Sequence, residues 1–439
     1  MRKLQTAGLA AALIAVLVAV AAYAMGQAPL DRYALVSGLV LLALGVGTIG
    51  SLRTLTFTAW VVAAVVAAVV TPAIFQPFPP GSASYKLLLL LLIQAVMFGM
   101  GTQMGLRDFA GVARSPAPVG IGLLCQFSIM PLLGYTLAVV FRLPAEIAAG
   151  MVLIGSCSSG LASNVMAYIG GANLALSITL TAVATLLAPV VTPFWMTTLA
   201  SSLLEGTTVD LSFLSMMAGI VKIVLVPTGA ALVHDYLLNA GRAGRGVVYA
   251  LAAAGVAVPA LLIGGVVQPS SDTRLLVEVT AWVLGGVAFG VAYHAAVTAL
   301  PLIARAMPAV AMAGIVYVTG MTTAEGREHL MTVGVALVAA AALHNLLGFV
   351  LGYWMSRGLG MDRQSARTVA FEVGMQNGGM ATGLAVEMGK LGTLGLPAAI
   401  FIAWMNISGS LLATFWRRRP VDGEHAASVR SPADGASPK

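Results

Sequence analysis

Long apolar runs are the feature that most constrains this chain. Runs of roughly 18 to 28 residues recur along the sequence with few charges, and a helix of that length crosses about 30 Å of hydrocarbon. Hydrophobic residues make up 59% of the chain and charged residues 9%, which is more apolar surface than a water-exposed fold can bury. Because backbone groups in lipid need internal partners, such runs form helices. The sequence therefore predicts an all-α polytopic protein that lies in the lipid bilayer.

These runs predict about fourteen membrane spans. With the N-terminus on the cytoplasmic side, most arginines and lysines fall in the inside connections, as expected for a bacterial-type inner-membrane protein with both termini in the cytoplasm. The net charge of +7 then reflects topology and predicts no nucleic-acid partner. The expected spans lie near residues 7–26, 33–50, 54–75, 87–105, 116–141, 145–169, 173–200, 212–237, 246–268, 276–300, 302–321, 330–356, 364–389 and 395–416.

The two ends of the chain have patterns of their own. Met1, Arg2 and Lys3 precede an apolar stretch that ends near Tyr23, so a cleaved signal peptide is an alternative to a first span. Residues 418–439 are rich in alanine, serine, proline, glycine and charged residues, which predicts a disordered cytoplasmic tail.

Two of the spans contain small and polar residues near their middle. The first run is Gly155-Ser156-Cys157-Ser158-Ser159-Gly160-Leu161-Ala162-Ser163-Asn164, and the second is Glu372-Val373-Gly374-Met375-Gln376-Asn377-Gly378-Gly379-Met380. Glycine weakens a helix, and an unwound segment at membrane depth can present its carbonyls to an ion. The sequence therefore predicts two broken helices, near residues 156–164 and 373–380.

A different interpretation of small residues in a membrane helix is tight helix packing, and for the first run alone it is the more common one. The second run favours a functional site, because Glu372 is ionisable and lies well inside a span, followed by Gln376 and Asn377. Burial of a carboxylate in hydrocarbon without a cation or a proton costs several kcal/mol.

At these residues the sequence resembles the bile acid:sodium symporter family. The similarity extends with interruptions over residues 54–417 and implies two inverted five-helix repeats, a panel domain and a core domain in which the two broken helices cross. By this resemblance, sodium and substrate meet at the crossing. The segments that carry it are Met97-Phe98-Gly99-Met100-Gly101, Leu143-Pro144-Ala145-Glu146-Ile147, Ala162-Ser163-Asn164-Val165-Met166, Glu372-Val373-Gly374-Met375-Gln376-Asn377 and Asn406-Ile407-Ser408-Gly409-Ser410-Leu411-Leu412-Ala413-Thr414.

The resemblance implies two sodium ions. Their oxygen ligands are the kind that a hard cation prefers, namely carboxylate, amide, hydroxyl and carbonyl groups. Carried over by residue, the first site comprises Ser163, Asn164, Ser177, Thr181 and Glu372, and the second comprises Gln126, Glu372, Val373, Met375 and Gln376.

The substrate that the family implies is a small organic anion. Backbone amides at the N-termini of the half-helices supply partial positive charge for it, and Asn377 and Asn406 are candidate cavity groups. Two of the expected substrate residues depart from the family pattern. Leu161 lies in a segment that lacks the family's usual proline and threonine, and Met405 stands where bacterial relatives often have a histidine. We therefore expect a changed selectivity with unchanged sodium ligands.

A core of ten helices leaves four of the expected spans unexplained. A symmetric placement adds one pair near 33–75 and another near 246–300, which makes repeats of residues 1–206 and 207–417 with a broken helix sixth in each. An odd number of helices per repeat gives the two repeats opposite orientations. A competing placement adds two helices at the N-terminus and two in the second half.

The function that follows is secondary active sodium:organic anion symport by alternating access. One alternative is a proton-coupled carrier in which Glu372 titrates, and another is a non-transporting membrane sensor. An enzyme is not expected, because the sequence shows neither a nucleophile with a base nor a metal triad.

Overall fold

The computed structural model describes residues 30–49, 55–209, 211–266 and 268–421, with a few residues between 14 and 25. Most of the expected first span and the expected tail beyond residue 421 lie outside these residues. Within them the protein is helical and contains no strand. The elements are α2 (Leu30–Thr48), α3 (Thr56–Val70), η2 (Pro72–Phe75), α4 (Ala83–Gly101), α5 (Leu106–Phe109), α6 (Gly111–Arg114), α7 (Pro116–Val140), α8 (Ala145–Ser156), α9 (Leu161–Ile169), α10 (Leu174–Trp195), η3 (Met196–Ala200), α11 (Ser201–Leu203), α12 (Phe213–Ile220), η4 (Val221–Leu225), α13 (Val226–Asn239), α14 (Arg242–Ile263), α15 (Ser271–Ala299), α16 (Leu302–Glu325), α17 (Arg327–Gly358), α18 (Arg363–Gly374), α19 (Gly378–Glu387) and α20 (Leu396–Arg417).

Ten helices of the described chain are long and apolar enough to cross a membrane. This confirms an all-α polytopic membrane protein, while the count of fourteen spans stays a prediction. Part of the difference has a local cause. The apolar runs near 145–169 and 364–389 are each divided into two short helices, and α3 has 15 residues because Pro72 lies just beyond its end.

Two of the long helical segments change their winding inside the membrane. A π-helical turn, η3, follows Pro193 at the end of α10, and a second, η4, precedes Pro227 at the start of α13. Proline cannot donate the usual backbone hydrogen bond, so a π turn beside it keeps the helix continuous with altered phase.

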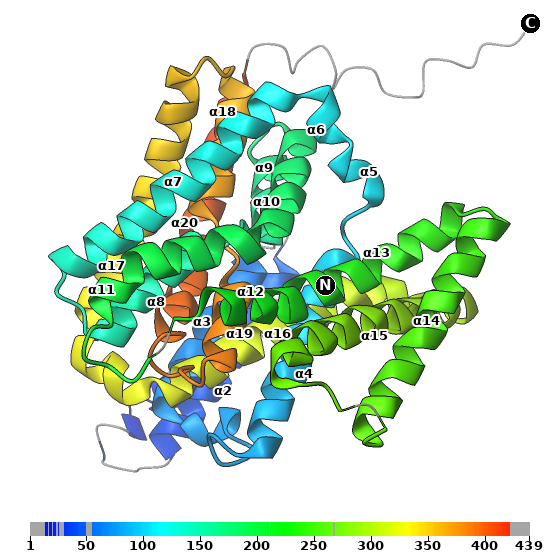
Figure 1. Cartoon of the computed structure of the whole chain (residues 1–439). Helices are drawn as coiled ribbons and strands as arrows, with labels where there is room; N and C mark the ends of the chain where they lie inside the picture. The colour runs from blue at the N-terminus through cyan, green and yellow to red at the C-terminus, as the bar shows by residue number, and fades with distance from the viewer. Residues whose placement is uncertain are drawn as a thin grey trace, which may run out of the picture.

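The helices pack in two groups (Figure 1). In one group α7 packs on α8, α17 and α18, and α20 packs on α17; in the other, α4 and α3 pack on α16, and α13 packs on α4. Close approach depends on glycine. A Cβ on Gly155 of α8 would lie 2.4 Å from the carbonyl oxygen of Met130, and one on Gly101 of α4 would lie 2.8 Å from the Cα of Thr228.

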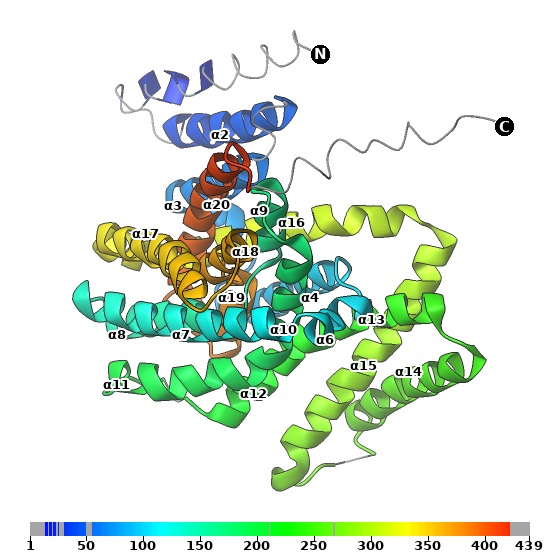
Figure 2. The ribbon, with the colours of Figure 1, turned by 90° about the horizontal axis from the view of Figure 1, so that it is seen from above.

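A hairpin of α14 and α15 projects from these two groups (Figure 2). The two helices pack along each other, and α15 also packs on α13. The hairpin therefore forms a separate lobe of the molecule (Figures 1 and 2). The helices nearest the two ends of the chain, α2 and α20, do not belong to this lobe: α2 packs on α3, and α20 packs on α17.

Candidate functional site

Two helix breaks meet in the middle of the first group. The chain leaves α8 at Ser156 and re-enters a helix at Leu161, and it leaves α18 at Gly374 and re-enters one at Gly378. The breaks run antiparallel, and each satisfies the other's backbone. The Gly160 amide donates to the Met375 carbonyl at 3.0 Å, and the Asn377 amide donates to the Ser158 carbonyl at 2.8 Å. Unwound backbone is thereby tolerated at membrane depth.

The carboxylate of Glu372 lies beside this crossing and is 1% exposed. One oxygen accepts hydrogen bonds from the hydroxyls of Ser163 and Ser177, both at 2.6 Å. The other accepts from Thr181 at 2.9 Å and from Ser159. Four hydroxyl donors therefore surround a buried carboxylate that has no cationic side chain among the described hydrogen-bond partners. Desolvation of a charge is offset here by hydrogen bonds alone.

Asn164 completes this oxygen cluster. Its side-chain oxygen accepts from Ser177 at 2.7 Å and from Thr181 at 3.3 Å. The structure thus brings together all residues of the first expected sodium site: Ser163, Asn164, Ser177, Thr181 and Glu372. Ser159, from the first break, joins the cluster and was missed by sequence reasoning, although it lies in the serine run that marked the break.

The residues of the second expected sodium site form a second hydrogen-bonded group, which involves α7 and both breaks. The amide nitrogen of Gln126, from α7, donates to the side-chain oxygen of Gln376 at 3.0 Å and to the carbonyl of Cys157 at 3.1 Å. Gln376 in turn donates to the Val373 carbonyl at 2.6 Å. The Met375 carbonyl is adjacent but accepts from the opposite break.

One oxygen in this second group has no partner. The side-chain oxygen of Gln126 is buried and receives no hydrogen bond from the described residues. A buried acceptor without a donor is rare and indicates a missing partner, for which a cation is chemically suited. The carboxylate of Glu372 faces the hydroxyl groups of the first cluster, so the structure does not bring its side chain into this second group.

The expected substrate residues are spread around the ends of the half-helices. Asn377 caps α19 by accepting from the Met380 amide at 3.0 Å, and its side-chain nitrogen is buried without a partner among the described residues. Asn406 donates back to the Ile402 carbonyl at 2.7 Å within α20. Met405 is buried beside it, and Leu161 begins α9. None of these four residues lines either of the two cavities described below.

A small cavity instead lies between the two helix groups. It is bounded by α4 and α16 on one side and by α19 and α20 on the other. Apart from Gly379, which belongs to the second polar run, sequence reasoning missed the residues that line it, because single hydroxyls in separate apolar spans form no visible cluster. The lining residues are Ile93, Val96, Ile315, Val318, Thr319, Gly379, Thr382 and Ile402.

A further residue that sequence reasoning missed supports the second break. Asn345 of α17 donates to the carbonyl of Gly374 at 2.7 Å, and its own oxygen accepts from Ser408 at 2.5 Å. Gly374 is the last residue of α18, so its carbonyl has no partner inside the helix. Asn345 therefore acts as a cap supplied by a neighbouring helix.

The chain is similar to known sodium-dependent transporters. It is 33% identical over 377 residues to the uncharacterized sodium-dependent transporter YocS of Bacillus subtilis, covering 86% of this chain and 95% of that protein. It is 27% identical over 373 residues to the probable chloroplastic sodium/metabolite cotransporter BASS1 of Oryza sativa subsp. japonica, covering 85% and 75%. It is also 30% identical over 198 residues to the ileal sodium/bile acid cotransporter of Oryctolagus cuniculus, covering 45% and 56%.

The family profile agrees with these relatives. The profile described as the sodium bile acid symporter family matches residues 89–268, which include the first break and the residues that α9 and α10 contribute to the oxygen cluster. Together with the extent of similarity to YocS, this match confirms the resemblance drawn from the sequence. The chain belongs to the sodium bile acid symporter family, whose members are membrane transporters rather than enzymes.

Proposed function

We propose that this protein is a secondary active symporter that couples sodium entry to uptake of a small organic anion by alternating access. The observation that carries the proposal is the oxygen cluster at the crossing. A buried carboxylate, an amide oxygen and four hydroxyls converge there from α9, α10, α18 and the first break. The relatives named as sodium-dependent transporters and sodium cotransporters support the same coupling ion.

Sodium suits this cluster for a physical reason. The hydroxyl oxygens of Ser159, Ser163, Ser177 and Thr181 keep lone pairs whichever acceptor receives their protons, so these oxygens are available to a cation that neutralises the carboxylate. Because these residues belong to different elements, a bound ion would hold α9, α10 and α18 together. Sodium binding would then order the crossing before the anion arrives.

A second sodium ion is proposed in the second hydrogen-bonded group. The partnerless oxygen of Gln126 supports it, with Gln376 and the backbone carbonyls of Val373 and Met375 as further ligands. Glu372 would contribute to this ion through its charge, since its carboxylate oxygens face the first cluster.

Helix lengths support inverted repeats. The first broken helix has halves of 12 and 9 residues and precedes a 22-residue helix, and the second has halves of 12 and 10 residues and also precedes a 22-residue helix. In the packing, α3 contacts α16 and α13 contacts α4. These two contacts are equivalent if α3 corresponds to the segment α12–α13 and α4 corresponds to α16.

This correspondence supports the competing placement of the added spans. The repeats would begin at α3 and at α12, with an addition at the N-terminus and the hairpin α14–α15 inserted in the second repeat. We assign α3, α4, α12, α13 and α16 to the panel, and α7 to α10 with α17 to α20 to the core. The core would move against the panel during transport, and the small cavity between α4, α16, α19 and α20 lies at that boundary.

The anion would bind where the half-helices begin. Helix N-termini carry unpaired amides and partial positive charge, and α9 and α19 both begin at the crossing. The partnerless side-chain nitrogen of Asn377 is a donor available to a carboxylate or sulfonate. Asn406, Met405 and Leu161 remain our candidates for the surrounding pocket.

The decisive experiment is uptake into proteoliposomes from a panel of organic anions, with an inward sodium gradient, an inward proton gradient, or neither. We expect at least one anion to accumulate only with the sodium gradient. Accumulation driven equally well by protons in sodium-free buffer would establish the proton-coupled carrier instead. Binding without any accumulation would favour the non-transporting sensor.

A further inference from the structure

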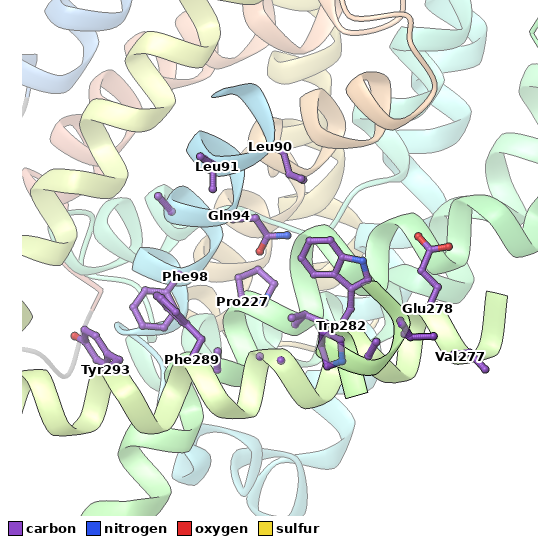
Figure 3. Close-up of a pocket in the computed structure, with 18 of the residues that line it drawn as sticks. Leu90, Leu91, Gln94, Phe98, Pro227, Val277, Glu278, Trp282, Phe289 and Tyr293 are labelled. Atoms are coloured by element: carbon purple, nitrogen blue, oxygen red, sulfur yellow. The ribbon is translucent and has the colours of Figure 1, made fainter. Parts of the chain in front are cut away.

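The hairpin α14–α15 encloses a large cavity against α4, α13 and α16 (Figure 3). Its volume is about 930 Å³, and its walls are almost entirely apolar. Leu91 and Phe289 line it and are 58% and 55% exposed, so large apolar side chains lie there without protein cover. Apolar side chains exposed on membrane-spanning helices face lipid, and here they line a cavity, so the expected occupant is an apolar group of the membrane.

The cavity is elongated. Its lining runs along α15 from Arg274 to Tyr293, which corresponds to roughly 28 Å at 1.5 Å per residue. Figure 3 shows Val277 and Glu278 at one end and Phe98, Phe289 and Tyr293 at the other. This length exceeds the roughly 15 Å of hydrocarbon in one leaflet, so the cavity can take an extended alkyl chain over its whole length, whereas a compact organic acid would fill only a part of it.

The charged residues of the lining gather at one end of the cavity. Glu278 is paired with Lys222 of η4 at 3.1 Å, which offsets its charge. Arg274 lies one turn after the first residue of α15, near the connection that joins the hairpin, and no ion pair joins it to another described side chain. A guanidinium at a helix N-terminus is a strong partner for a phosphate.

We propose that this cavity holds one membrane phospholipid, with an acyl chain along α15 and its phosphate on Arg274. The site is separate from the oxygen cluster, since none of the cluster residues lines it. The hairpin would thereby hold a resident lipid against the panel helices α4, α13 and α16. Failure of this proposal would leave the symport proposal untouched.

The test is retention of lipid by the full-length protein purified in mild detergent, measured by native mass spectrometry. The protein is offered either a two-chain phospholipid or a diacylglycerol that lacks the phosphate. We expect the parent to retain one phospholipid and to bind diacylglycerol about tenfold more weakly. Arg274→Gln should lower phospholipid retention about tenfold and remove the preference for phosphate.

A second variant fills the cavity. Gly285 lines it, and a Cβ there would meet nothing closer than the Gly255 carbonyl oxygen at 4.0 Å, so the first side-chain atom of Gly285→Leu fits without a backbone clash. We expect this variant to lose both lipids. Gly246→Leu and Arg242→Gln in α14 are matched controls, because neither residue lines the cavity and Gly246 has open space at its Cβ.

The outcomes that overturn the proposal are specific. Equal retention of phospholipid by the parent and by Gly285→Leu would place the lipid elsewhere. Displacement of the phospholipid by a short-chain organic anion would make the cavity a second substrate site. If Arg242→Gln lowered phospholipid retention as much as Arg274→Gln does, the effect would be one of general surface charge and not of a phosphate site at Arg274.

Discussion

At the scale of single residues, the site is organised around one carboxylate. Glu372 accepts four hydroxyl hydrogen bonds in a position that is 1% exposed. The donors around this carboxylate carry no net positive charge, so a sodium ion bound in the cluster would supply the charge that balances an ionised Glu372. Coupling of transport to sodium then depends on that charge more than on any single hydroxyl.

Glu372→Gln tests this dependence. The amide keeps the shape of the side chain but removes the charge, so we expect sodium-dependent uptake to be abolished while the protein remains folded. Uptake in proteoliposomes and thermal unfolding in detergent measure the two effects. Glu328→Gln is the matched control, because Glu328 is exposed at the start of α17. We expect this variant to transport as well as the parent protein. Sodium-driven uptake by Glu372→Gln would contradict the proposed site.

Ser159→Ala tests the ligand that sequence reasoning missed. Removal of one hydroxyl bonded to a buried charge costs about 1.5 to 3 kcal/mol, so we expect apparent sodium affinity to fall at least about tenfold. The measurement is the sodium dependence of uptake. Ser128→Ala is the control, since the Ser128 hydroxyl only donates back to Leu124 on an exposed face of α7. An unchanged sodium dependence would remove Ser159 from the site.

At the scale of elements, the helix breaks are held by neighbours as much as by their own residues. The carbonyl at the end of α18 is capped by Asn345 from α17, which is itself held by Ser408 from α20. The ends of α8 and α18 also share backbone hydrogen bonds across the crossing. Each break is therefore rigid only in the assembled protein.

Asn345→Leu should expose this dependence. The change leaves the Gly374 carbonyl without its buried partner, which costs about 1 to 3 kcal/mol, while the Ser408 hydroxyl can still donate to the Trp404 carbonyl within α20. We expect a lower unfolding temperature in detergent and weaker sodium binding. Asn239→Leu is the control, because Asn239 is exposed at the end of α13. Stability equal to that of the parent would show that water or another group caps the break.

The sequence could predict the broken helices, because glycines, serines and Glu372 are contiguous there and conflict with an apolar span. By family resemblance it could also predict five residues that the structure brings together in the oxygen cluster, and their role as sodium ligands stays a prediction. It could not predict Ser159 as a partner of Glu372, nor the cap from Asn345, because both depend on how distant helices pack. The cavity beside α15 was equally hidden, since its lining has the ordinary composition of lipid-facing helices.

At the scale of the whole molecule, the described helices divide into two packed groups and a projecting hairpin (Figure 1). Lys222 connects the hairpin and α19 through two carboxylates. Lys222 of η4 pairs with Glu278 on the hairpin at 3.1 Å and approaches Glu387 at the end of α19 at 3.8 Å. Movement of the core against the panel would lengthen the second contact and leave the first intact.

The charge balance of the loaded transporter gives the prediction at this scale. The two sodium ions that we propose would carry one positive charge more than a monoanionic substrate, so each cycle should move one net charge inward. At about 2.3 kcal/mol per charge for 100 mV, an inside-negative potential should raise uptake strongly. Uptake of a monoanion is measured with the potential clamped at zero and at an inside-negative value. Indifference to the potential would indicate a single coupling cation.

The hydrogen bonds between the two breaks also have a consequence for the synthesis and membrane insertion of the chain. Ser159 and its partner Glu372 are separated by 213 residues. At about 5 to 20 residues per second, synthesis of that interval takes about 10 to 40 s. During this time the first break is in the membrane with its backbone groups and serines lacking their final partners. We therefore expect the half-made chain to be sheltered by the insertion machinery or by other helices, and chains truncated before Glu372 to be degraded rapidly.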